Sequence, residues 1–81
     1  MDVSSKMAML KAIRSARPDL FPLDADLIDS IQNKALSAPQ KLNGEELFLL
    51  SVATLEQTLW EYYNDADPDN GDEQFYTDLM Q

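Results

Sequence analysis

The sequence predicts an all-α fold, a small three-helix bundle with a short fourth helix or helical tail at its C-terminus. Three observations lead to this prediction. Apolar residues recur at spacings of three and four along successive segments, which is the periodicity of amphipathic helices. Residues that favour helix caps precede these segments, and turn-forming residues separate them. The chain has 81 residues, the size of one domain, so we expect residues 1–81 to form a single acidic helical unit.

The first predicted helix covers residues 5–16. Ser4 or Ser5 is suited to cap its free amide groups, and Pro18 ends it because a residue that precedes proline avoids helical geometry. One face carries the apolar residues that we expect to be buried: Met9, Ala12, Ile13 and Ala16. A neighbouring arc carries the basic stripe of the chain: Lys6, Lys11, Arg14 and Arg17.

The second predicted helix covers residues 25–36, with Asp24 as its cap. Its inner face is expected to consist of Leu27, Ile28, Ile31 and Ala35. The link before it is rich in turn residues, yet it also carries apolar side chains that we expect to close one end of the core: Leu20, Phe21 and Leu23.

The third predicted helix, residues 44–63, is the element around which we expect the others to pack. Asn43 is suited to cap it, and Glu46, three residues later, is suited to reach back in a capping box. Its wide apolar face consists of Phe48, Leu49, Val52, Ala53, Leu55, Leu59, Trp60, Tyr62 and Tyr63. Only Glu56 interrupts this face, and it is expected at the rim of the core, paired with an N-terminal Lys or Arg, or in a partner site.

Beyond Tyr63 the composition changes abruptly to turn formers and acids, so residues 64–72 are predicted to form an acidic loop. Asp72 is suited to cap a last helix over residues 73–80. A helix this short is marginal alone in water, and we therefore expect it to dock on the bundle or on a partner.

The charge of the chain is strongly asymmetric. The formal net charge is −9, and all six Lys and Arg lie in the first 41 residues, whereas residues 42–81 hold ten acids and no basic residue. Such a field repels nucleic acid and anionic membranes and attracts basic surfaces. We therefore expect no direct nucleic-acid binding and no membrane binding, and we interpret the basic stripe as neutralising the acidic half in cis or across a dimer.

The residue types present argue against an enzyme and against a cofactor. The chain has no Cys and no His, and its two glycines are too far apart for a phosphate-binding loop. The common zinc and haem ligand sets are therefore missing. No apolar run has the length of a signal peptide or a membrane span, so we expect a soluble, cytoplasmic protein.

The run Asp65, Asp67 and Asp69 resembles the opening of a calcium-binding loop, because alternating acids supply oxygen ligands. It departs from the EF-hand pattern at Asn70, where a glycine is expected, and at Tyr76, where a glutamate is expected. We favour an acidic loop without a metal site. If this loop is extended, acids two apart lie about 6.5 Å from each other.

The candidate partner-binding site is the acidic and aromatic junction after the middle of the third helix. Its residues are Glu56, Trp60, Glu61, Tyr62, Tyr63, Asp65, Asp67, Asp69, Asp72 and Glu73. The expected partner is a protein with a basic surface, such as a nucleic-acid-handling enzyme, and binding would be fast and salt-sensitive. In charge alone the chain is similar to phage- or plasmid-borne inhibitors and to immunity proteins. The alternative is an adaptor subunit whose apolar helix faces form a homodimer or hold a partner helix.

Overall fold

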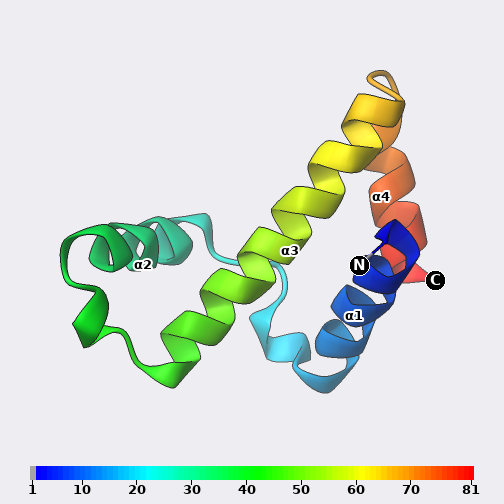
Figure 1. The fold of residues 1–81 in the computed structure, drawn as a ribbon. Helices are drawn as coiled ribbons and strands as arrows, with labels where there is room; N and C mark the ends of the chain where they lie inside the picture. Colours follow the sequence, from blue (N-terminus) through cyan, green and yellow to red (C-terminus); the bar gives the residue numbers. More distant parts are fainter. Residues whose placement is uncertain (1) are drawn as a thin grey trace.

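The computed structural model describes residues 2–81, and within them all regular structure is helical, as predicted (Figure 1). The α-helices are α1 (Val3–Ala16), α2 (Ala25–Ser37), α3 (Gly44–Ala66) and α4 (Gly71–Met80). Two single-turn 3₁₀ helices, η1 (Pro18–Leu20) and η2 (Pro39–Lys41), precede α2 and α3. None of the helices in this part of the chain combines the length and the apolar character needed to cross a bilayer.

Helix α3 is the centre of the fold, as predicted, because it contacts each of the other three α-helices. Figure 1 shows α1 and α4 on one side of α3, whereas α2 lies on the other side beside its N-terminal half. Helices α1 and α4 also pack against each other. Helix α3 thus separates α2 from the other two α-helices.

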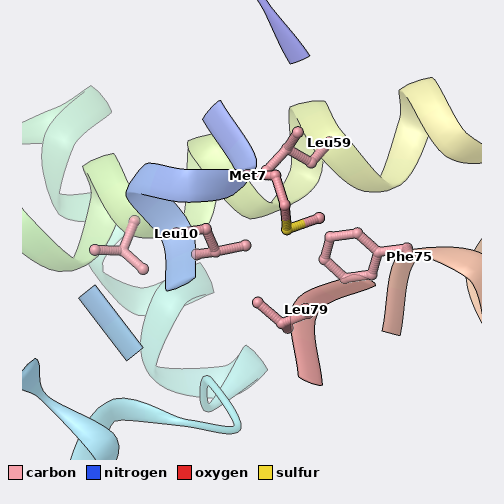
Figure 2. Close-up of a cluster of buried hydrophobic side chains, with 6 residues drawn as sticks. Met7, Leu10, Leu59, Phe75 and Leu79 are labelled. Atoms are coloured by element: carbon pink, nitrogen blue, oxygen red, sulfur yellow. The ribbon is translucent and has the colours of Figure 1, made fainter. Parts of the chain in front are cut away.

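The core has two parts. The first core cluster joins α1, α3 and α4 and consists of Met7, Leu10, Val52, Leu59, Phe75 and Leu79; five of these side chains are labelled in Figure 2. The second core cluster joins α2 and α3 and is smaller, with Ile28, Ile31 and Leu49 as its buried members. Leu23 packs against both clusters, Phe21 against the first and Leu20 against the second. The link before α2 therefore fills the core as predicted.

The predicted buried face of α1 is wrong. Met7 and Leu10 are the buried side chains, whereas Met9 is 41% exposed and Ala12 and Ala16 face solvent. Only Ile13 of the predicted face packs against the first core cluster. Both faces of α1 carry apolar residues, and the position of α4 decides which one is covered, because Phe75 and Leu79 of α4 belong to the same cluster.

The start of α1 also differs from the prediction. The helix begins at Val3, and its cap is Asp2, whose Oδ1 accepts a hydrogen bond from the Ser5 amide at 2.7 Å. An aspartate is as good a cap as a serine, and its position two residues before Ser4 allows an earlier start.

Helix α2 begins at the predicted residue. The Asp24 carboxylate accepts hydrogen bonds from the Asp26 and Leu27 amides at 3.0 and 3.2 Å. Ile28 and Ile31 are buried as expected, but Leu27 is 47% exposed. Because α2 packs against α3 alone among the α-helices, its buried face is narrower than the sequence suggests.

The predicted capping box begins α3. Asn43 Oδ1 accepts from the Glu46 amide at 2.8 Å, and Glu46 Oε1 accepts from the Asn43 amide at 3.0 Å. Glu46 Oε2 also accepts from Lys34 Nζ at 2.7 Å, which links the start of α3 to α2. These contacts lower the pKa of Glu46, with the Lys34 hydrogen bond as the larger cause.

The acidic loop is shorter than predicted, because the helices on both sides extend into it. Helix α3 continues to Ala66, and Asp67, which precedes Pro68, closes it. Helix α4 begins at Gly71, with Asn70 rather than Asp72 at the N-cap position. Of the predicted loop, residues 64–72, only residues 67–70 lie outside the two helices.

Candidate acidic binding site

The turn between α3 and α4 is a compact connection held by backbone hydrogen bonds. The Asp67 amide donates to the Tyr63 carbonyl at 3.0 Å, and the Gly71 amide donates to the Asp67 carbonyl at 2.7 Å. Asp67 Oδ1 also accepts from the Asp69 and Asn70 amides, both at 3.3 Å. Asp67 therefore both carries charge and shapes the turn.

Gly71 lets α4 approach α3 closely. A Cβ atom at this position would lie 2.3 Å from the carbonyl oxygen of Tyr63 and 2.6 Å from the Cα of Asn64. Both are backbone atoms, which cannot rotate away. The sequence around Gly71 does not show that a glycine is sterically required there, although a glycine directly after Asp69 and Asn70 is a turn signal.

Helix α4 is attached to α3 through Tyr63 and Asp78. The Tyr63 hydroxyl donates to Asp78 Oδ2 at 2.6 Å, and Asp78 Oδ1 accepts from Gln74 Nε2 at 3.0 Å. Burial, together with the hydrogen bond to Asp78, raises the pKa of Tyr63 to about 12. The ring of Tyr63 meets the fully buried ring of Phe75 at a centroid distance of 5.8 Å. No sequence signal pointed to Asp78, because its partner lies 15 residues away.

We define the acidic end as six exposed carboxylates on the last turns of α3, the turn and the first turn of α4: Glu61, Asp65, Asp67, Asp69, Asp72 and Glu73. Within residues 2–81, the ion pairs all lie elsewhere and join Arg17 to Asp19, Arg17 to Glu45, and Lys34 to Glu46. The interpretation that the basic stripe neutralises the acidic half in cis is therefore confirmed only for Arg17, and the neutralisation does not reach the acidic end. Arg17 pairs with Glu45, which belongs to the acidic half but lies at the start of α3.

The negative charge near the C-terminal end of α3 is also unfavourable for the stability of this helix. The carbonyl end of a helix carries partial negative charge, and acids there are destabilising by a few tenths of a kcal/mol to about 1 kcal/mol. Asp65 lies in the last turn of α3, which has no basic residue. Asp72 and Glu73, in the first turn of α4, are placed where acids are favourable. Asp65 is thus poorly placed for stability.

The three aromatic residues of the candidate site differ in exposure. Tyr63 packs against the first core cluster, whereas Trp60 is 38% exposed and Tyr62 is 51% exposed. The rings of Tyr62 and Tyr63 meet edge to face at a centroid distance of 5.9 Å. Two aromatic side chains next to the acidic end are therefore accessible to a partner.

Glu56 lies apart from the acidic end. It precedes Asp65 by nine residues, about 13 Å along the helix axis. Its carboxylate is half-buried, burial raises its pKa, and none of the hydrogen bonds or ion pairs within residues 2–81 involves it. It shares a cleft with Arg14 without forming an ion pair. The structure thus places Glu56 at the rim of the core.

The acids do not adopt the extended arrangement considered for the loop. Asp65 is helical and Asp67 closes the helix, so the two do not have the spacing of an extended strand. In the described part of the chain, no three carboxylates converge in a way that could hold a metal ion.

The acidic end offers fixed negative charge beside two accessible aromatic rings, on a hairpin held by Gly71 and by the Tyr63 to Asp78 hydrogen bond. Such a surface suits Lys and Arg side chains, which bind carboxylates through charge-assisted hydrogen bonds and aromatic rings through cation–π contacts. Comparisons of the chain with protein-family models, curated proteins and solved structures find no match.

Proposed function

We propose that this chain is a non-enzymatic binding module whose acidic end docks on a basic surface of a partner protein. The observation that carries the proposal is that the negative charge of the acidic end is not neutralised within the chain. The ion pairs of residues 2–81 involve none of its six carboxylates. A surface of this kind attracts a basic partner over about a Debye length, roughly 8 Å at physiological salt.

The partner is a nucleic-acid-handling protein whose basic site is occupied by the acidic end in place of DNA or RNA. The six carboxylates of the acidic end lie between residues 61 and 73 with no basic residue among them, a charge density that suits a site built for phosphates. The exposed rings of Trp60 and Tyr62 lie beside these charges, and aromatic residues of this kind often dominate the binding energy of an interface. The chain then acts as an inhibitor or as an immunity protein.

A rigid hairpin supports this function. Binding is weakened when a loop must be ordered at the interface, and a preorganised surface avoids that loss. The turn of residues 67–70 is fixed at both ends by backbone hydrogen bonds, and α4 is fixed by its buried Phe75.

The test uses two double variants that remove the same amount of charge. Asp65→Asn with Asp69→Asn changes the acidic end, and Asp26→Asn with Asp29→Asn changes the exposed face of α2. A partner is first captured from host and competitor lysates with the wild-type chain and identified. Its affinity is then measured for each variant, at low and at physiological salt, with and without competing DNA or RNA.

We expect the variant of the acidic end to bind about 2- to 30-fold more weakly, because each exposed charge pair is worth about 0.2–1 kcal/mol. The variant of α2 should retain most of the affinity, and nucleic acid should displace the wild-type chain. An affinity that is insensitive to salt, or an equal loss in both variants, would contradict the proposal.

A further inference from the structure

Helix α2 is held in place by a single helix. Among the α-helices of residues 2–81 it packs against α3 alone, whereas α1 and α4 each pack against α3 and against each other. Figure 1 shows α2 on its own side of α3, away from α1 and α4. The loss of one interface would therefore free the whole of α2.

The interface between α2 and α3 is also small. It is built on the second core cluster, whose buried side chains are Ile28, Ile31 and Leu49. The largest fully buried side chains all belong to the first core cluster instead. Within residues 2–81, one side-chain hydrogen bond joins α2 to another α-helix, from Lys34 Nζ to Glu46 Oε2 at 2.7 Å. Opening this interface exposes less apolar surface than unfolding the first core cluster, so it costs less free energy.

The segments on the two sides of α2 show where it can separate from the rest of the chain. The 3₁₀ helix η1, before α2, packs against α1, and Phe21 packs against the first core cluster. The 3₁₀ helix η2, after α2, packs against α2 itself. The first link therefore stays with α1, and η2 moves with α2. The two points of rotation are at Asp24, before α2, and at residues 42–43, before α3.

We propose that α2 and η2, residues 25–41, form a lid that opens away from α3 as one unit while α1, α3 and α4 stay packed around the first core cluster. The opening uncovers the apolar stripe of α3 that the lid covers, with Leu49 as its buried member. The acidic end lies on α3 and α4, whose packing is kept in the open state. The lid therefore does not depend on the proposed function.

The test is native-state hydrogen exchange of single backbone amides, measured by NMR on the whole chain. Each rate, relative to the rate of an unprotected amide, reports the free energy of the opening that exposes that amide. We expect the slowest amides of α2 to exchange at least about tenfold faster than the slowest amides of α1 and α4. Their exchange should also respond less to low concentrations of urea, because the lid exposes less surface than global unfolding.

Two matched variants separate opening of the lid from global unfolding. Ile31→Val and Leu10→Val each remove one CH₂ group from a buried side chain, one in each core cluster. Ile31 is packed only while the lid is closed, so its truncation should speed the slowest amides of α2, α1 and α4 alike, by about fourfold. Leu10 is packed whether the lid is closed or open. Its truncation should speed the slowest amides of α1 and α4 by a similar factor and leave those of α2 within about twofold of wild type.

Two results would overturn the lid. The first is a wild-type chain in which the slowest amides of α2 open with the same free energy as those of α1 and α4. The second is a Leu10→Val variant in which the slowest amides of α2 are accelerated as much as those of α1. Either result would mean that α2 unfolds only together with the first core cluster. No partner is needed for these measurements, so a failure of the lid is distinguishable from a failure of the proposed function.

Discussion

At the scale of single residues, Gly71 shows how one side chain determines the position of a whole helix. The close approach of α4 to the backbone of α3 leaves no room for a Cβ atom at this position. A larger residue would push α4 away from Tyr63 and so disturb the packing of Phe75 in the first core cluster.

We predict that Gly71→Ala lowers the free energy of unfolding by about 1–3 kcal/mol, the usual range for overpacking. The matched control is Gly44→Ala, because a Cβ atom there meets nothing within 4 Å. The control should be neutral or stabilising by about 0.4–1 kcal/mol, since alanine restricts the unfolded chain. Urea unfolding measures both values, and equal effects of the two substitutions would refute the steric explanation.

At the scale of helices, local signals predicted the starts of α2 and α3, and contacts that are distant in sequence decided the rest. The caps Asp24 and Asn43 are local, since their hydrogen bonds reach only two or three residues. The buried face of α1 depends instead on Phe75 of α4, more than 60 residues away. Periodicity in α1 alone therefore could not choose between Met7 and Met9.

The candidate site, like the helices, could be predicted only in part from the sequence. The charge of the acidic end and its position after Tyr63 follow directly from the sequence. The helical conformation of much of this site does not follow from the sequence, because the composition of residues 64–72 is typical of a loop. Only Pro68 marks where α3 must end. The exposure of Trp60 and the burial of Tyr63 depend on which side of α3 receives α4.

The attachment of α4 to α3 predicts a pH dependence at the alkaline end. The pKa of Tyr63 is raised to about 12 in the folded chain, above the unfolded value of about 10. The folded state therefore favours the neutral phenol, and this contribution is present below about pH 10 and is lost as the pH rises towards 12. Ultraviolet absorbance of tyrosinate should show one of the three tyrosines titrating near 12.

Tyr63→Phe should remove that titration and lower the free energy of unfolding at neutral pH by about 1 kcal/mol, the net value of a typical hydrogen bond. The control is Tyr62→Phe, because Tyr62 is 51% exposed and lies next to Tyr63. If Tyr62→Phe, and not Tyr63→Phe, removed the titration near 12, the assignment would be wrong.

At the scale of the whole molecule, the charges and the apolar surface are separated along α3. The acidic end lies at the C-terminal end of this helix. A groove between α1 and α3, in which Lys6 is the only charged residue among the described lining, lies along its N-terminal part. The ion pairs of Arg17 and Lys34 are also near the start of α3. One helix therefore carries a strongly acidic surface at one end and an apolar surface at the other.

The same separation predicts how salt affects folding. Like-charge repulsion within the acidic half opposes the compact state. The ion pairs within residues 2–81 are those of Arg17, which are exposed, and that of Lys34 with Glu46, which is partly buried, and each contributes about 0–1 kcal/mol. Screening should therefore stabilise the fold overall, and Tm should rise from low to moderate salt. The double variant Asp65→Asn with Asp69→Asn should raise Tm at low salt and reduce the dependence of Tm on salt. Both effects should be larger than in the double variant Asp26→Asn with Asp29→Asn.

Self-association of an acidic chain would also raise Tm with salt, because salt screens the repulsion between copies, and protein concentration separates the two causes. Screening within one chain gives a Tm that does not depend on concentration, whereas a dimer gives a Tm that rises with it by mass action. We therefore expect the rise of Tm with salt to be the same at low and at high protein concentration. A Tm that fell steadily from low to moderate salt would mean that the ion pairs of Arg17 and Lys34 outweigh the repulsion within the acidic half.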